Sequence, residues 1–167
     1  IGGFVDARGY GGKTLNGNGQ AGGQVAIYAA NSLLLASTGV IDASTTHADE
    51  RGGDVMLGIG WGANGKLYLQ KGAQINVSGG TKGGLTGGTL TLRAPRDGNN
   101  DVKIAFLSDV LSSDGSGFAE IPIDGTSVGI TGARSVAVNG YVAFDTQAGG
   151  HGIDGSALGW NGLVDPA

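Results

Sequence analysis

A six-residue stretch, Gly22-Gly23-Gln24-Val25-Ala26-Ile27, decides the fold because its pattern recurs. The later copies read Gly52-Gly53-Asp54-Val55-Met56-Leu57 and Gly87-Gly88-Thr89-Leu90-Thr91-Leu92. In each copy a Gly-Gly turn precedes residues that alternate along the chain, which is the pattern of a β-strand with one buried face. We therefore expect two internal ladders, formed by Val25, Val55 and Leu90 and by Ile27, Leu57 and Leu92.

A second element precedes each Gly-Gly pair. It reads Val5-Asp6-Ala7, then Ile41-Asp42-Ala43-Ser44, then Ile75-Asn76-Val77-Ser78. Its copies begin 36 and 34 residues apart. Further short strands are expected at residues 33–36 and 66–69, and glycine-rich loops at residues 8–21, 45–51 and 79–86. One period therefore holds three short strands and a loop, without a helix.

This period predicts an all-β fold, a parallel β-helix of roughly six coils in which each coil stacks on the previous one. Glycine is expected at the coil corners, often at positive φ. An antiparallel sandwich would also offer short strands and frequent turns. The solenoid is preferred, because a sandwich has no reason to repeat one pattern in register.

The repeats also suggest how the chain is organised. We expect a single segment over residues 1–167, with regular repeats at residues 1–95 and less regular coils at residues 96–167. Strands in the second part are expected at residues 102–107, 119–123, 127–130, 135–138 and 141–144. Because the chain opens at Ile1 and Met56 is its single methionine, we interpret it as a processed product or a part of a longer chain.

Composition excludes several classes of protein. Glycine contributes 36 of 167 residues, whereas proline contributes three and cysteine none. These values exclude collagen and a disulfide-stapled module. A helical bundle is disfavoured, because each internal glycine costs about 1 kcal/mol relative to alanine. The formal net charge of −4, without a run of Lys or Arg, argues against nucleic acid as a partner.

Three stretches resemble one family of proteins. Gly72-Ala73-Gln74-Ile75-Asn76-Val77-Ser78-Gly79-Gly80 and Gly87-Gly88-Thr89-Leu90-Thr91-Leu92-Arg93-Ala94-Pro95 are similar to repeats of large filamentous-haemagglutinin-like exoproteins of Gram-negative bacteria. The later stretch Ile130-Thr131-Gly132-Ala133-Arg134-Ser135-Val136-Ala137-Val138-Asn139-Gly140-Tyr141 resembles a segment that follows such repeats in that family.

The resemblance implies a right-handed parallel β-helix that is exported by two-partner secretion, through an outer-membrane transporter. It implies display at the bacterial cell surface or release, and adhesion, matrix or competition roles carried on a long shaft. Neither the family's secretion-signal domain nor a toxin tip is recognisable in this chain. No functional residue of the family is therefore carried over to it.

Asp6, Asp42 and Asn76 occupy one position of the repeat and form the first candidate site. One interpretation is a row of oxygen ligands for Ca²⁺ or for sugar hydroxyls. The simpler interpretation is a polar turn, or an outward ladder of side-chain hydrogen bonds. The turn is favoured, because asparagine in place of aspartate weakens a cation site.

A second candidate is Gly149-Gly150-His151-Gly152-Ile153-Asp154, which begins like a Ca²⁺-binding nonapeptide. Ser156 stands where that motif has a large apolar residue, and the motif occurs once. A single copy is weak, because such sites are shared between adjacent copies. Binding of Ca²⁺ near Asp154 therefore stays open.

The acidic and aromatic side chains are the candidates for catalysis and sugar binding. Glycoside hydrolysis needs two convergent carboxyl groups, and no pair is indicated among Glu50, Glu120 and the loop aspartates. His47 is interpreted as solvated surface, since its loop offers too few metal ligands. The loop aspartates are Asp97, Asp101, Asp109 and Asp114, and the aromatic residues that could stack on sugars are Tyr10, Trp61, Tyr68 and Trp160. The favoured interpretation of these aromatic residues is that they cover loops or ladders.

The sequence thus predicts a non-enzymatic structural or adhesive shaft segment of a secreted bacterial surface protein. No catalytic, cofactor-binding or metal-binding residue is assigned, and no cofactor is expected. The expected partners are the rest of a longer chain or further copies stacked end to end into fibres, with glycans or host surfaces as ligands. The alternative is a carbohydrate-active β-helix, a polysaccharide lyase or hydrolase.

Overall fold

The computed structural model describes residues 1–9, 19–60, 64–80, 86–112, 117–122 and 127–142. These residues form twelve β-strands and no helix. Within them, no helix is long and apolar enough to cross a membrane. The strands are β1 (Phe4–Asp6), β2 (Gln24–Ala29), β3 (Ser32–Leu35), β4 (Val40–Asp42), β5 (Asp54–Ile59), β6 (Lys66–Gln70), β7 (Gln74–Asn76), β8 (Gly88–Pro95), β9 (Ile104–Leu111), β10 (Phe118–Ile121), β11 (Gly129–Thr131) and β12 (Ala133–Tyr141).

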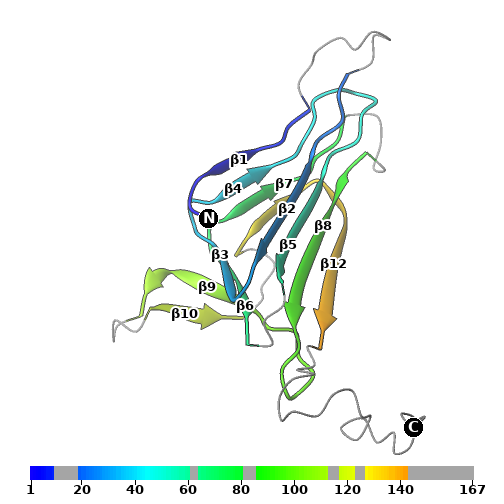
Figure 1. The fold of residues 1–167 in the computed structure, drawn as a ribbon. Coiled ribbons are helices and arrows are strands. Elements are labelled where there is room, and N and C mark those ends of the chain that lie inside the picture. Colours follow the sequence, from blue (N-terminus) through cyan, green and yellow to red (C-terminus); the bar gives the residue numbers. More distant parts are fainter. Residues whose placement is uncertain (10–18, 61–63, 81–85, 113–116, 123–126, 143–167) are drawn as a thin grey trace, which may run out of the picture.

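The strands assemble into three sheets of four strands each (Figure 1). Their orders are β1-β4-β7-β11, β2-β5-β8-β12 and β3-β6-β9-β10. Neighbouring strands run parallel in every pair except β9 and β10, which run antiparallel. The first three strands of each sheet therefore come from stretches of sequence that lie about one repeat apart, whereas the last strands, β10, β11 and β12, depart from this spacing.

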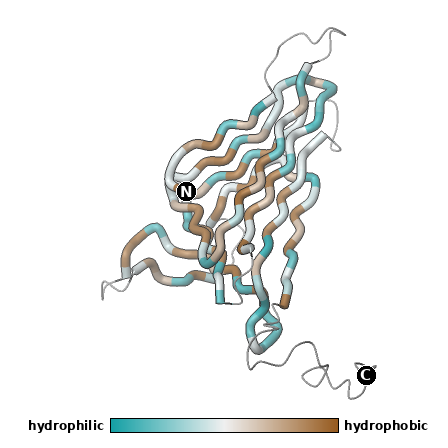
Figure 2. The backbone as a smooth tube through the Cα atoms, viewed as in Figure 1, coloured by the Kyte–Doolittle hydropathy of each residue, from teal (hydrophilic) through white to brown (hydrophobic). Residues whose placement is uncertain are grey.

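The two internal ladders predicted from the repeats are confirmed. Val25 pairs with Val55, which pairs with Leu90, and the second ladder joins Ile27, Leu57 and Leu92. The side chains of Val55, Leu57 and Leu90 are at most 1 % exposed. Figure 2 shows the apolar bands along the strands. Burial of this alternating face against the other two sheets is the main contribution to stability.

The β-helix of roughly six coils, right-handed by resemblance, was a wrong prediction. The described strands form three four-stranded sheets of mixed direction rather than six stacked coils. The prediction extended the period of residues 1–95 over the rest of the chain. There, β9 continues to Leu111 and β10 folds back antiparallel to it, so these residues add a hairpin instead of a coil.

The second half differs from the prediction in detail as well. The strand expected at residues 135–138 is part of a longer strand, β12, which runs from Ala133 through Gly140 to Tyr141. Of the strand expected at residues 141–144, Tyr141 belongs to β12, and residues 143 and 144 lie outside the described residues. The division of the chain into residues 1–95 and 96–167 stays a prediction.

The prediction that positive φ explains the glycines of the Gly-Gly pairs is wrong. Positive φ among the described glycines occurs at Gly72, Gly117 and Gly132, none of which belongs to these pairs. At Gly53 an added Cβ would lie 1.9 Å from the carbonyl oxygen of Gly23, and at Gly88 it would lie 1.8 Å from that of Gly53. Glycine is required at these positions because the backbones of adjacent repeats approach too closely for any side chain.

Candidate functional site

The first candidate site lies in the sheet β1-β4-β7-β11, where Asp6, Asp42 and Asn76 pair in register. The side-chain oxygen of Asp42 accepts a hydrogen bond from the backbone N–H of Ser44 at 3.0 Å. That of Asn76 accepts one from the N–H of Ser78 at 3.1 Å and another from its hydroxyl at 2.7 Å. The repeat position is therefore a turn in which a side-chain oxygen holds the backbone two residues later.

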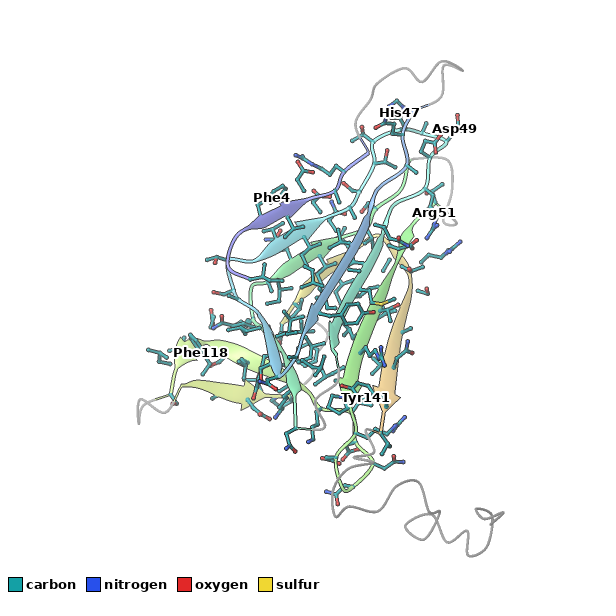
Figure 3. All side chains as sticks on the ribbon, in the orientation of Figure 1. Phe4, His47, Asp49, Arg51, Phe118 and Tyr141 are labelled. Carbon is teal, nitrogen blue, oxygen red and sulfur yellow. The ribbon has the colours of Figure 1, made fainter. Side chains whose placement is uncertain are left out.

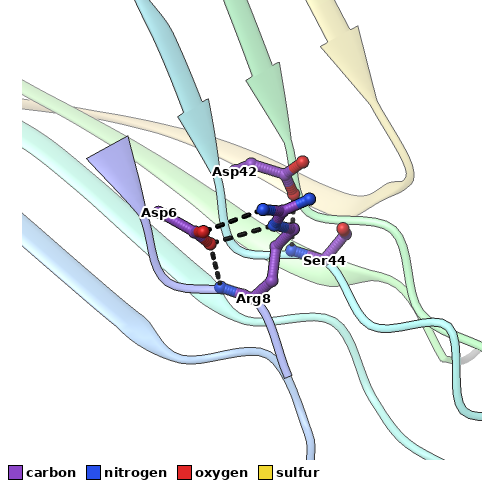
Figure 4. Close-up of polar contacts among 4 residues, drawn as sticks. All are labelled: Asp6, Arg8, Asp42 and Ser44. Carbon is purple, nitrogen blue, oxygen red and sulfur yellow. Dashed lines mark hydrogen bonds and ion pairs between the residues drawn. The ribbon is translucent and has the colours of Figure 1, made fainter. Parts of the chain in front are cut away.

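Asp6 forms the same turn and adds an ion pair (Figure 4). Its Oδ1 accepts hydrogen bonds from the backbone N–H of Arg8 at 3.1 Å and from Arg8 Nε at 2.9 Å. Its Oδ2 lies 2.8 Å from Arg8 Nη2. A guanidinium at this distance opposes the approach of a cation, so Asp6 does not fit the Ca²⁺ interpretation.

The ladder therefore supports the polar-turn interpretation of these residues. In each of the three residues the side-chain Oδ1 is already an acceptor for an N–H group of the chain itself. Just after the ladder, Ser44 and Thr45 are buried and polar. The hydroxyl of Thr45 donates to the carbonyl oxygen of Gln20 at 2.7 Å. The polar positions of the repeat thus fix the path of the chain as it leaves the strand.

His47, Asp49 and Arg51 lie together at one end of the molecule, beyond the strand ends (Figure 3). The carbonyl oxygen of His47 accepts a hydrogen bond from the N–H of Glu50 at 3.2 Å. In the described part of the chain, no three His, Asp or Glu side chains gather as metal ligands would. This end carries no metal-binding geometry among the residues that the structure places.

Of the other acidic residues, Glu120 and Asp109 are separated by the fold, whereas Asp97 and Asp101 share one turn. Glu120 of β10 forms an ion pair with Lys66 of β6, and Asp109 lies 3.7 Å from Lys71 Nζ. Asp97 accepts hydrogen bonds from the N–H groups of Asn99 at 2.9 Å and Asp101 at 3.1 Å. Asp114 and the glycine-rich stretch at residues 149–154 lie outside the described residues, as do Tyr10, Trp61 and Trp160.

One carboxylate has a shifted pKa. Partial burial raises the pKa of Asp54, but hydrogen bonds from Thr89 and Arg51 and the charge of Arg51 outweigh this effect. The pKa of Asp54 therefore lies below its ordinary value of 3.8. Thr89 sits opposite Asp54 on the adjacent strand. The hydrogen bond between Thr89 and Asp54 joins two adjacent strands on the outer face of the sheet.

A polar groove that the sequence did not reveal lies beside Tyr68. It has a volume of about 420 Å³, and Asp97, Asp101, Lys66 and Lys103 line it together with Tyr68. Lys66 Nζ lies 5.6 Å from the centre of the Tyr68 ring. The sequence marks Tyr68 as an aromatic candidate, but Asp97, Asp101 and Lys103 come from a turn about thirty residues later. Only the parallel pairing of β6 with β9 brings that turn next to the ring.

A second hollow is apolar and lies between β9 and the strands β11 and β12. Its volume is about 390 Å³, and the side chains that line it include Phe106, Ile130 and Val138. No sequence signal marks it, since the same alternation of apolar residues occurs in strands whose inner faces are fully covered.

Comparison of the chain with protein-family models, with curated proteins and with solved structures finds no match.

Proposed function

We propose that this chain is a non-enzymatic structural and adhesive segment of a secreted bacterial surface protein. The observation that carries the proposal is the set of parallel ladders. β5 and β8 have a paired strand on both sides, and their inward side chains are almost fully buried. Strands that pair in register with their neighbours on both sides make a stiff body, because each strand is fixed by two rows of hydrogen bonds.

The polar residues of the repeat support the same role. Asp6, Asp42 and Asn76 hold turns through hydrogen bonds to their own chain. These turns fix the points from which the loops leave the sheets. A rigid body that presents loops is suited to adhesion, because loops can contact a surface while the sheets keep them in position. Export by two-partner secretion and placement at the cell surface rest on the sequence resemblance alone.

A polysaccharide lyase or hydrolase is the second candidate function. The groove beside Tyr68 favours it, because the groove combines an aromatic ring with the two carboxylates Asp97 and Asp101. Aromatic rings stack on sugar faces, and most glycosidases use a pair of carboxyl groups as their catalytic residues. Asp97 already accepts two backbone hydrogen bonds within its own turn, which gives it a structural role.

The two candidates are separated by an assay on a panel of polysaccharides. The purified chain is incubated with each polymer, and the release of reducing ends and of unsaturated sugars is followed. The structural proposal predicts no turnover. Turnover that disappears in the Asp97→Asn/Asp101→Asn variant, while Asp109→Asn retains it, would replace the structural proposal with the enzymatic one.

The structural and adhesive parts are tested separately. Limited proteolysis should leave a resistant fragment that contains the paired strands, whereas the core variant Leu57→Ala should be degraded faster. Equal degradation of the two proteins would contradict a stiff body.

Beads coated with the chain should attach to glycan or matrix surfaces more than beads coated with the Gly53→Ala variant. Equal attachment would remove adhesion from the proposal.

A further inference from the structure

The polar groove beside Tyr68 contains an aromatic ring with apolar neighbours. Tyr68 is half-buried and lies on the outer face of β6, since Leu67 and Leu69 on either side of it are fully buried. Val102 and Ile104 line the same groove. A sugar ring has an apolar face of C–H groups, and an aromatic side chain packs well against such a face. The groove therefore has a surface that suits the apolar face of a sugar.

The hydroxyls of a sugar need both donors and acceptors, and the groove offers both. Ser32, Asn64 and Lys103 bring donors, and Asp101 brings carboxylate acceptors. Asp101 is exposed, and in the described part of the chain its carboxylate has neither a hydrogen-bond donor nor an ion-pair partner. The carboxylate of Asp101 can therefore accept hydrogen bonds from a ligand.

The turn that joins β8 to β9 forms one wall of the groove and is held by several hydrogen bonds. Arg96 pairs with Val102 across its base. The N–H of Asp97 donates to the carbonyl oxygen of Asp101 at 2.8 Å. The Oδ1 of Asp97 accepts from the N–H groups of Asn99 at 2.9 Å and Asp101 at 3.1 Å. A turn fixed in this way holds Asp101 in place before a ligand arrives, which lowers the entropy cost of binding.

The charges of the groove favour a neutral sugar over an acidic one. Two ammonium groups and two carboxylates line the groove, from Lys66, Lys103, Asp97 and Asp101. Glu120 forms an ion pair with Lys66 and adds a third carboxylate. A sugar that carries a carboxylate or sulfate would therefore meet more negative than positive charge, whereas neutral hydroxyls hydrogen-bond to both kinds of group.

We propose that this groove binds a neutral sugar unit of a polysaccharide without cleaving it, with Tyr68 against the sugar face and Asp101 as an acceptor for its hydroxyls. Hydrolysis needs two carboxyl groups that act on one bond, and Asp97 is already engaged in holding the turn. The inference rests on the adhesive part of the proposed function, for which it names the class of ligand and the place of binding.

An NMR titration of the isotope-labelled full chain is the first test. The probes are neutral oligosaccharides of glucose, of galactose and of mannose, together with an acidic oligogalacturonate. At least one neutral probe should shift the amide signals of residues 64–68 and 96–104, and the oligogalacturonate should bind more weakly. Absence of shifts with every neutral probe, shifts confined to other residues, or tighter binding of the oligogalacturonate would each overturn the proposal.

Substitution of the aromatic ring tests the stacking contact. Tyr68→Ala should weaken binding of the neutral probe about tenfold, whereas Tyr68→Phe keeps the ring and should stay close to the parent. The matched control is Tyr28→Ala, which removes a tyrosine that is 47 % exposed on a different sheet. Equal losses in Tyr68→Ala and Tyr28→Ala would contradict stacking on Tyr68.

The turn provides a second variant that does not disturb the core. Asp101→Ala changes an exposed side chain and should weaken binding about threefold or more, because a hydrogen bond to the sugar is lost. Asp109→Ala is its control, since Asp109 lies beside Lys71 and outside the groove. This pair decides the matter if Tyr68→Ala changes the circular dichroism spectrum. Binding by Asp101→Ala as tight as that of the parent would overturn the role of this carboxylate.

Attachment assays separate this inference from the proposed function. Beads coated with Asp101→Ala should attach less than parent beads to surfaces that carry the neutral glycan. Attachment equal to that of the parent would overturn the groove as the adhesive site, while adhesion itself would stand. A parent chain that binds the soluble probe in the groove but attaches to no surface would remove adhesion and support the groove as a binding site. Cleavage of the probe by the parent would overturn binding without turnover.

Discussion

The carboxylate of Asp54 accepts a hydrogen bond from the hydroxyl of Thr89, with 2.6 Å between Oδ1 and Oγ1. The two residues are opposite neighbours on β5 and β8, within the second and third copies of the Gly-Gly stretch. Arg51 forms an ion pair with the same carboxylate. The contact links two repeats through a carboxylate that titrates, and so it makes the stability of the fold depend on pH.

The first prediction concerns Asp54→Asn. Because the pKa of Asp54 is lower in the folded chain than its ordinary value of 3.8, the ionised carboxylate stabilises the fold at pH values above 3.8. This contribution is lost as the pH falls through the lowered pKa. The variant should therefore be less stable than the parent at neutral pH, and the difference should close below pH 3.8. Chemical denaturation at a series of pH values measures it.

The control for this experiment is Asp109→Asn, which alters an exposed carboxylate 3.7 Å from Lys71 Nζ. Exposed ion pairs contribute about 0–1 kcal/mol, so this variant should follow the parent closely at all pH values. A constant difference between Asp54→Asn and the parent down to strongly acidic pH would contradict the role of the Thr89 and Arg51 contacts.

The second prediction concerns the central ladder. Leu57 is fully buried between Ile27 and Leu92. Leu57→Ala leaves a cavity in the core and should lower the free energy of unfolding by about 2–5 kcal/mol. The same substitution at Leu111, which is 61 % exposed, should change it by about 0.5 kcal/mol or less. Similar losses at both positions, measured by urea denaturation, would show that the ladder is not the core.

The third prediction concerns the Gly-Gly pairs. In Gly53→Ala the new Cβ would collide with the carbonyl oxygen of Gly23, a backbone atom held by a hydrogen bond from Asp54. The repeats would have to separate, and the cost should reach or exceed the about 1–3 kcal/mol of an overpacked core. Gly3→Ala is the matched control, because nothing lies within 4 Å of its Cβ position. A Gly53→Ala variant that melts at the parent's temperature would refute this explanation of the motif.

The fourth prediction concerns the turn ladder. Asp42→Ala removes the acceptor for the N–H of Ser44 and should cost about 1 kcal/mol. Asp42→Asn keeps an oxygen at that position, as Asn76 does in the next repeat, and should stay within about 0.5 kcal/mol of the parent. Thermal melts with and without added Ca²⁺ complete the test. A Ca²⁺-dependent rise in Tm that Asp42→Ala abolishes would restore the cation-site interpretation.

Much of the strand pairing could be predicted from the sequence. The alternation after each Gly-Gly pair identifies the buried face, and the common spacing identifies which strands are neighbours. The pairings of Val25 with Val55 and of Asp42 with Asn76 follow directly from that spacing. The prediction was wrong for the whole fold, because residues 96–142 do not repeat the pattern. Alternation alone does not distinguish a strand that continues a parallel stack from one that folds back, as β10 does.

Of the two candidate sites, one could be predicted from the sequence and the other could not. The sequence placed Asp6, Asp42 and Asn76 at one position, and simple chemistry favoured a turn over a cation site. It could not bring Tyr68 together with Asp97 and Asp101, because they belong to different repeats and meet only through the pairing of β6 with β9.

The sequence by itself determined which residues face inward and which strands stack, because both follow from local alternation and a constant spacing. The tertiary structure alone decided which of these inward faces the other described residues cover. Whether Val136 and Val138 are buried depends on what lies beyond β12, and not on their own pattern, which is that of the buried Leu90 and Leu92. Burial is a property of the neighbours that a side chain meets, so an identical pattern gives core in β8 and exposed surface in β12.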